Sequence, residues 1–296
     1  LVRRDEQGQS SLAGLEIDFV AIRKRGARPL LAITGICAGI FSLAFVASWL
    51  MGLHPIFGLA LGATSVGLPL AILKETGQLR SPVGQQILLL GSVGEFLSVI
   101  GMTLFYFIAK YGFSVELLIG LAKLVGLLAV AGLTLRAFMG LAWWKPHKFA
   151  GLVDAHEQSE IGVRASLLLM MAFSLLGMLA GMEAIVGAFV AGALLAFVLR
   201  GKDVLEEKLA VVGHGLFIPI FFIEVGLRFD LSAVTGPALL FAGQLTLAAF
   251  LVRLVPCVAL LRLDVPVRDM LGIASLLSAP LTLVVAIAAL GAQLGV

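Results

Sequence analysis

The sequence predicts an all-α protein that crosses a membrane many times. Its 296 residues are 60% hydrophobic and only 13% charged, whereas soluble domains are roughly 45–50% apolar and about 25% charged. The mean hydropathy is +1.08. The apolar runs are continuous and about 20 residues long, which is typical of membrane-spanning helices, and they lack the alternation of a transmembrane barrel. These observations exclude a water-soluble protein.

Nine apolar segments account for most of the chain. They are 29–51, 54–73, 84–109, 113–143, 161–181, 184–199, 209–227, 234–261 and 270–293. A shorter segment, 12–22, resembles the end of a truncated helix. Segment 184–199 is short and rich in small residues, which favours close helix packing. The chain begins without Met and stops inside an apolar stretch, so we expect a fragment of a longer protein.

The basic residues between these segments predict the orientation. If 23–28 is cytoplasmic, alternation places thirteen Lys and Arg inside and only Lys110 and Arg228 outside. The thirteen are Arg23, Lys24, Arg25, Arg28, Lys74, Arg80, Lys145, Lys148, Arg200, Lys202, Lys208, Arg262 and Arg268. This asymmetry follows the positive-inside rule, and one missed helix would destroy it.

The sequence predicts no enzyme and no cofactor. It contains no nucleophile–base pair, HExxH or phosphate-binding loop. The two cysteines lie inside apolar segments without metal-ligand spacing, and the four histidines are scattered. We therefore expect no resident metal and no nucleic-acid partner.

Ionisable residues inside the apolar segments are candidates for function, because a charge in hydrocarbon is expensive. Six occur: Glu95, Lys123, Arg136, Arg164, Glu224 and Arg253. Glu95 lies roughly 16 Å along its helix at about 1.5 Å per residue, and Ser92 and Ser98 share its face. Arg253 reaches a similar depth. We expect Glu95 and Arg253 to face one another or a water-filled cavity, although a purely structural buried pair stays open.

Two segments contain residues that interrupt helices. Segment 54–73 carries Gly62, Thr64, Ser65, Gly67 and Pro69, and segment 270–293 carries Ser275, Ser278, Pro280 and Thr282. Pro removes a backbone donor and Gly weakens a helix, so both segments are predicted to be broken helices. Half-helix ends near the membrane midplane form ion sites in transporters with inverted repeats. Kinked but unbroken helices are the alternative.

Four stretches resemble a known family. They are "LAGLEIDF" (12–19), "GATSVGLPLAILKETG" (62–77), "SEIGVRASLLLMMAFSLLGMLAGMEAIVGAFVAGALLA" (159–196) and "EEKLAVVGHGLFIPIFFIEVGLRFDLS" (206–232). The chain resembles the second family of monovalent cation:proton antiporters, the Na⁺/H⁺ and K⁺/H⁺ exchangers of bacteria and plants. The resemblance covers nearly the whole chain in the family's order.

The resemblance implies an antiporter fold with inverted repeats and two broken, crossed helices, incomplete at both ends. Residues 1–22 would be a helix remnant, 23–110 the first core half, 111–232 a linker helix with dimerisation or scaffold helices, and 233–296 the second core half. It also implies a homodimer in a lipid bilayer, at the bacterial inner membrane. The missing parts would be two N-terminal helices, most of a third and the last core helix.

The resemblance also implies a site. Helix 84–109 would carry the ion-binding carboxylate, Glu95, and helix 234–261 its counter-charge, Arg253. Thr64, Ser65 and Ser92 would complete the ion-binding and proton-coupling group, and the helix breaks would involve Gly67, Pro69, Ser278 and Pro280. Relatives place Asp-Asp, Asn-Asp or Gln-Asp where this chain has Gly94-Glu95.

The function implied is exchange of Na⁺ or K⁺ for H⁺ by alternating access. One titrating carboxylate and no acid at position 94 predict one proton per cation, and therefore electroneutral exchange. Two alternatives stay open: a regulated K⁺ efflux or channel-like system on the same fold, and a non-transporting sensor.

Overall fold

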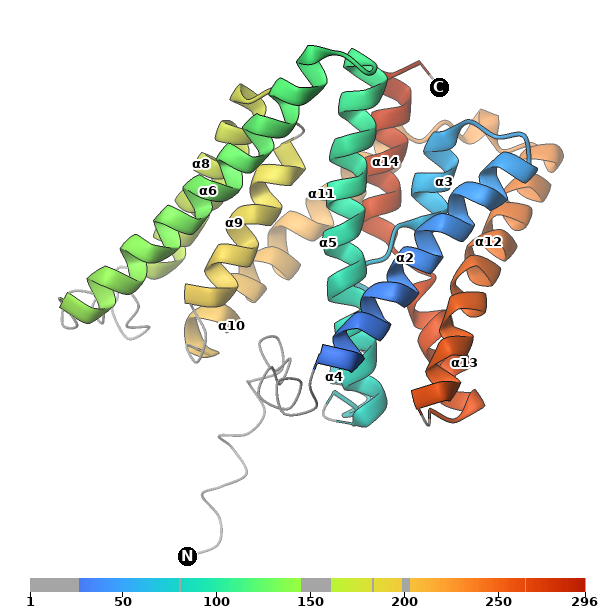
Figure 1. Cartoon of the computed structure of the whole chain (residues 1–296), viewed down its shortest axis with the longest axis horizontal. Coiled ribbons are helices and arrows are strands. Elements are labelled where there is room, and N and C mark those ends of the chain that lie inside the picture. Colours follow the sequence, from blue (N-terminus) through green and yellow to red (C-terminus); the bar gives the residue numbers. More distant parts are fainter. Residues whose placement is uncertain are drawn as a thin grey trace, which may run out of the picture. The chain divides into compact units, whose positions relative to one another are not determined.

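The computed structural model describes residues 27–79, 81–144, 161–182, 184–198, 203–263 and 265–295, and this part of the chain is helical without strands (Figure 1). The predicted remnant 12–22 lies outside the described residues. By contact, the chain divides into two compact units. Residues Glu16–Phe105 and Phe229–Val296 form what we call the broken-helix unit, and Tyr106–Arg228 form most of the second unit. The roles predicted for the chain's parts stay predictions.

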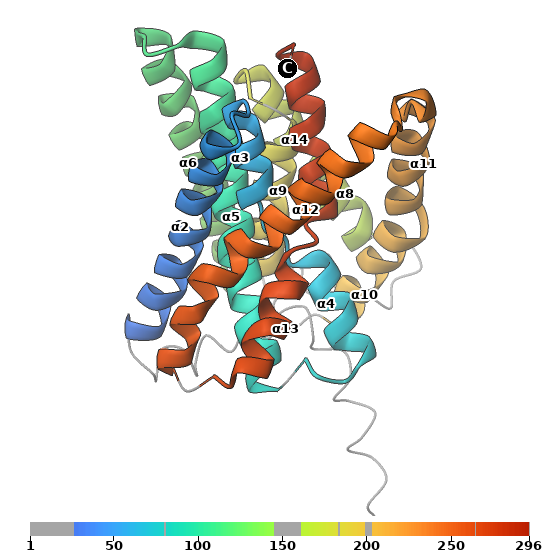
Figure 2. The same cartoon turned by 90° about the vertical axis from the view of Figure 1, so that its right-hand side faces the viewer.

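The broken-helix unit contains two helices that are interrupted. Its elements are α2 (Ala27–Leu50), α3 (Pro55–Gly62), α4 (Gly67–Glu75), most of α5 (Pro82–Tyr111), the 3₁₀ turn η2 (Leu231–Ala233), α12 (Gly236–Cys257), the 3₁₀ helix η3 (Val258–Leu263), α13 (Val267–Leu277) and α14 (Leu281–Gln293). The helix α2 packs on α3 and α12, and α3 also contacts α12 and α14, while α4 contacts α13. The two broken helices therefore run antiparallel, and each half of one meets a half of the other (Figure 2).

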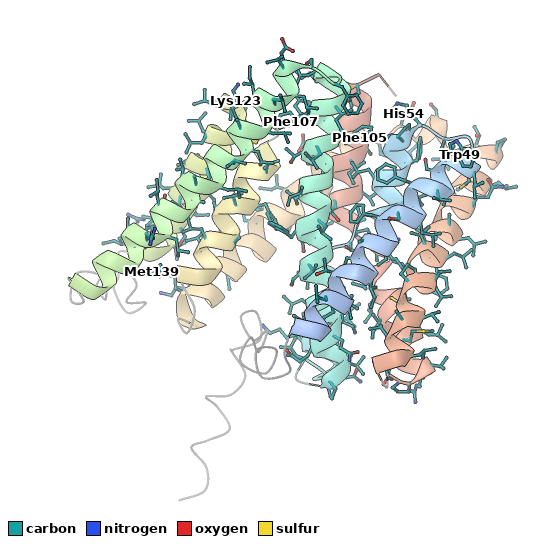
Figure 3. The ribbon with its side chains drawn as sticks, viewed as in Figure 1. Trp49, His54, Phe105, Phe107, Lys123 and Met139 are labelled. Carbon is teal, nitrogen blue, oxygen red and sulfur yellow. The ribbon has the colours of Figure 1, made fainter. Side chains whose placement is uncertain are left out.

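Local sequence explains where two of these helices begin. The Nδ1 atom of His54 accepts the N–H of Ile56 at 3.4 Å, and Pro55 occupies the first position of α3, where no N–H is needed. The His54 ring also lies edge-on to Phe105, with 6.2 Å between ring centroids (Figure 3). In the same way, Thr235 Oγ1 accepts the N–H of Ala238 at 3.4 Å at the start of α12. His54 is therefore a capping residue.

The second unit contains α6 (Val115–Trp144), α8 (Ile161–Leu179), α9 (Ala184–Val198), α10 (Asp203–Val212), the π-helical segment η1 (Gly213–Phe217) and α11 (Ile218–Arg228). The helix α9 packs on α8 and α6. A Cβ atom at Gly187 would lie 2.0 Å from the carbonyl oxygen of Phe173 in α8. The predicted close packing of the small-residue segment is therefore present, and it depends on this glycine.

The helices agree with the predicted segments but differ in length at two places. In the described ranges, six segments are long and apolar enough to cross a membrane, one of them the α3–α4 pair taken as one span, and the α13–α14 pair, bent by 42°, makes a seventh. The predicted segment 184–199 forms a helix of 15 residues, which spans about 22 Å at about 1.5 Å per residue, less than a bilayer core. The predicted segment 209–227 is divided by the π-helical turn, and its apolar helix covers Gly215–Leu227.

Candidate ion-binding site

The first interruption, Ala63–Val66, separates α3 from α4. Ala63 ends α3 and Val66 precedes α4, and Val66 has no capping side chain of its own. A helix that stops inside a protein leaves carbonyls at its end and N–H groups at its start without intrahelical partners. Pro69 lies in the first turn of α4, so it starts the half-helix rather than breaking the span. The interruption therefore needs partners from other helices.

Glu95 on α5 supplies the partner at the start of α4. One carboxylate oxygen accepts the N–H of Val66 at 3.0 Å, and the other accepts the Ser65 hydroxyl at 3.5 Å. Ser65 Oγ in turn accepts the N–H of Gly67 at 3.4 Å. The start of a helix carries partial positive charge, which stabilises an anion there. The deep acid predicted from the sequence is thus held by a half-helix, and its side chain is only half-buried.

Arg253 on α12 supplies the partner at the end of α3. Its side chain is wholly buried, and its guanidinium donates to the carbonyl oxygen of Ala63 and, at 2.6 Å, to that of Ala249. The end of a helix carries partial negative charge, which stabilises a cation. The Nε atom has no hydrogen-bond partner in the described part of the chain.

The predicted pairing of Arg253 with Glu95 is not present. No ion pair joins the two side chains within the residues that the structure covers; each contacts a different end of the same interruption, Ala63 for the base and Val66 for the acid. The physical reason is that a broken helix offers two backbone ends of opposite partial charge. The guanidinium therefore lies against a helix end and forms no ion pair with the carboxylate in the described part of the chain.

One face of α5 is shaped to receive the interrupted segment. A Cβ at Gly91 would lie 3.2 Å from Val66, and a Cβ at Gly94 would lie 1.9 Å from the hydroxyl oxygen of Thr64. One turn after Gly94, the buried Ser98 hydroxyl accepts the N–H of Thr64 at 3.0 Å and donates to the carbonyl of Gly94 at 2.7 Å. Gly91 and Ser98 are not among the site residues predicted from the sequence. The spacing of small residues at 91, 94 and 98, on one helical face, is the signal that identifies them.

Ser98 and Ser92 offer a matched pair of substitutions on α5. The hydroxyl of Ser98 bridges two segments, whereas that of Ser92, half-buried, has no hydrogen-bond partner among the residues described. We expect Ser98→Ala to destabilise the protein by about 1–2 kcal/mol, because it leaves a buried N–H unpaired, and Ser92→Ala to stay within about 0.5 kcal/mol. Thermal unfolding in detergent measures both. Equal shifts would contradict the bridging role of Ser98.

The second interruption lies between α13 and α14. The N–H of Ser278 bonds to the carbonyl of Ser275 at 3.1 Å, and its hydroxyl donates to the carbonyl of Ala274 at 2.7 Å, which closes α13. Pro280 immediately precedes α14 and has no N–H to continue a helix. Ser278 and Pro280 therefore lie at the break, where the sequence predicts them.

The other four ionisable residues of the apolar segments lie outside this arrangement. Lys123 (Figure 3) and Arg136 are on exposed positions of α6, and Arg164 and Glu224 are exposed on α8 and α11. Of the six candidates, only Arg253 is fully buried. The burial of Arg253 and the partial burial of Glu95 therefore distinguish these two residues from the four exposed ones.

Apolar helices of membrane-crossing length, together with two antiparallel broken helices and charged groups at half-helix ends, define a multi-pass membrane protein with an architecture that also occurs in secondary transporters. The chain also matches the profile of the family described as "Sodium/hydrogen exchanger, transmembrane" over residues 12–296. It belongs to this family. The resemblance to cation:proton antiporters is thereby confirmed.

Curated relatives support the same family membership. The chain is 30% identical over 305 residues to the Bacillus subtilis (strain 168) protein named "Putative Na(+)/H(+) antiporter YjbQ", with 96% of this chain and 48% of that protein covered. It is 29% identical to the Na(+)/H(+) antiporter of Enterococcus hirae, with coverages of 82% and 63%. It is 25% identical to the Na(+)/H(+)-K(+) antiporter GerN of Bacillus cereus, with coverages of 83% and 62%. The chain thus spans about half to just under two thirds of the length of these relatives.

Proposed function

We propose that the protein exchanges Na⁺ or K⁺ for H⁺ across the membrane by alternating access, with Glu95 as the exchange group. The observation that carries this proposal is the position of the carboxylate, which lies at the start of half-helix α4 and forms no ion pair with Arg253 within the described residues. A carboxylate in that position binds a proton or a cation but not both, and this exclusion couples the two ions. The relatives named above as Na(+)/H(+) and Na(+)/H(+)-K(+) antiporters support the choice of ions.

The groups around Glu95 suit a hard monovalent cation. Ser65 places its hydroxyl at the carboxylate, and Thr64 lies on the same interrupted segment. Oxygen ligands are what hard cations prefer. We propose Ser92, which shares the α5 face of Glu95, as a further ligand. Cation exchange by the Ser92→Ala variant tests this assignment. Arg253 does not itself carry the exchanged proton, because a guanidinium keeps its proton.

The proposed stoichiometry is one proton per cation. Gly94 has no side chain, so Glu95 is the only acid of the Gly94-Glu95 pair. A carboxylate that releases one proton for each monovalent cation moves no net charge. Exchange is then electroneutral.

The test is an exchange assay in proteoliposomes with a preset pH gradient and a clamped membrane voltage. We expect Na⁺ or K⁺ to dissipate the gradient at a rate that does not change with voltage. A voltage-dependent rate would contradict the stoichiometry. Cation flux that persists without a pH gradient would instead favour a channel-like K⁺ system, and no flux with any cation would favour a sensor.

We further propose a transporter, not an enzyme, that acts as a homodimer in the bacterial inner membrane. The multi-pass architecture and the family support residence in a membrane. The proposed dimer contact lies in 111–232, where α6 presents exposed apolar side chains that include Leu118, Val125 and Leu133. Cross-linking of cysteines placed at these positions in native membranes tests the dimer.

A further inference from the structure

The last two turns of α5 carry a lysine that is held by two tyrosines. The Lys110 ammonium donates a hydrogen bond to the Tyr106 hydroxyl at 2.9 Å. It also lies 5.1 Å from the centroid of the Tyr106 ring and 5.4 Å from that of the Tyr111 ring, within the range of cation–π attraction. Lys110 is exposed, and both tyrosines are half-buried. We call these three residues the tyrosine–lysine cluster.

The buried Phe107 fixes the two tyrosine rings in place. Its ring centroid lies 6.0 Å from that of Tyr106 and 6.2 Å from that of Tyr111. Phe107 in turn packs on α6, where a Cβ at Gly120 would lie 3.2 Å from its ring (Figure 3). The Tyr111 hydroxyl oxygen lies 3.8 Å from the Cβ position of Gly181, in the turn that follows α8. The cluster is therefore held by neighbouring elements and does not need a ligand to assemble it.

The cluster lies at the depth of phospholipid headgroups. The helix α5 has 30 residues and ends at Tyr111, so it is about 45 Å long at about 1.5 Å per residue, which matches the thickness of a bilayer with its polar regions. Lys110 is the second-last residue of this helix. Beside it, Ile108 and Phe113 expose apolar side chains, and Phe113 is 91% exposed. The end of α5 thus offers polar donors next to an apolar surface, as an amphipathic lipid requires.

The chemistry of the cluster favours an anion. Aromatic faces bind quaternary ammonium groups such as choline, but here the protein's own ammonium lies over both rings. An ammonium has three N–H donors, and a phenol hydroxyl can donate while it accepts. Even if both tyrosines accept from Lys110, one ammonium donor and two hydroxyl donors remain for a ligand. Three donors and a positive charge suit the oxygen atoms of a phosphate.

We propose that the tyrosine–lysine cluster binds the phosphate of an anionic phospholipid, whose acyl chains pack on the apolar side chains beside it. The headgroup of phosphatidylglycerol carries no cation that Lys110 would repel, in contrast to that of phosphatidylcholine. Such a lipid holds the end of α5, the helix that carries Glu95, at a fixed depth in the bilayer. The inference does not rest on the proposed exchange, because lipid binding is measured without transport.

Native mass spectrometry of the full chain tests the site with phosphatidylglycerol and with phosphatidylcholine of the same acyl chains. We expect one site that prefers phosphatidylglycerol about fivefold to tenfold. Lys110→Gln should weaken the binding of phosphatidylglycerol about tenfold, the effect of losing a hydrogen bond to a charged group, and Tyr106→Phe about threefold. Lys110→Arg keeps the charge and should stay within about threefold of the unchanged protein.

Lys123→Gln is the matched control, because Lys123 is an exposed lysine of the neighbouring helix α6 without an aromatic contact in the described part of the chain. It should leave the affinity unchanged. Equal weakening by Lys123→Gln and Lys110→Gln would indicate general attraction between the lipid and basic residues, and would overturn the inference. Unchanged affinity of the Lys110→Gln variant, or equal affinity for the two lipids, would also overturn it.

Thermal unfolding in detergent verifies that each variant folds and separates a lipid from a free anion. Phosphatidylglycerol should stabilise the unchanged protein more than the Lys110→Gln variant. Inorganic phosphate lacks acyl chains and should stabilise neither. Stabilisation by inorganic phosphate that is lost in the Lys110→Gln variant would show a site for free anions and contradict the lipid.

Discussion

Replacing Glu95 by Gln is expected to reduce cation-driven proton movement to the rate of liposomes without protein. An amide cannot ionise, so it cannot release a proton to a cation or balance the cation's charge. Its oxygen can still accept the N–H of Val66, which Glu95 accepts at 3.0 Å. The start of α4 therefore keeps a partner, and the loss of exchange reports the charge rather than a collapsed site.

Glu95→Asp is the matched control for this prediction. It keeps the charge but shortens the side chain by one methylene, so the carboxylate reaches Ser65 and Val66 less well. We expect slower exchange that still depends on pH and on cation concentration. The measurement is the decay of a preset pH gradient on addition of Na⁺ or K⁺. Full activity of the Gln variant would show that another group couples the ions.

The interruptions could be predicted because they depend on residue types that weaken or end a helix locally. Gly62 and Gly67 bracket the first break, and Ser278 and Pro280 occupy the second. Residues that remove backbone donors or weaken a helix act locally, wherever the helix lies. Pro69 shows the limit of this reasoning, because a proline within the first turn is compatible with the helix that it starts.

The partner of Arg253 could not be predicted, because it is a backbone group. Ala63 has an apolar side chain, and its carbonyl becomes an acceptor for the guanidinium only because α3 ends there. Pairing charges by sign, as sequence reasoning does, ignores the partial charges that appear at both ends of a broken helix. The contact between Thr64 and Gly94 was missed for a related reason: the absence of a side chain has meaning only once the facing segment is known.

Arg253→Met is the second substitution for which we expect a large effect. Met has a similar length and suits an apolar site, but it leaves the carbonyl of Ala63 at the end of α3 without its donor. Hydrogen bonds to charged groups contribute about 1.5–3 kcal/mol each, and relief of the buried charge offsets part of their loss. We expect destabilisation by about 2 kcal/mol and loss of exchange. Arg136→Met, at an exposed position of α6, is the control and should change neither.

A double-mutant cycle decides what Arg253 neutralises. Since the Arg253 guanidinium contacts Ala63 and Ala249, and the carboxylate of Glu95 contacts Val66 and Ser65, the two substitutions change groups with separate hydrogen-bond partners. The destabilisation of the double variant Glu95→Gln with Arg253→Met should therefore equal the sum of the single effects to within about 0.5 kcal/mol. A buried ion pair would behave differently, because losing one partner leaves the other unpaired at about 3–5 kcal/mol. Unfolding in detergent of the unchanged protein, the two single variants and the double variant gives the coupling energy. A coupling of about 3–5 kcal/mol would show that the two charges pair directly.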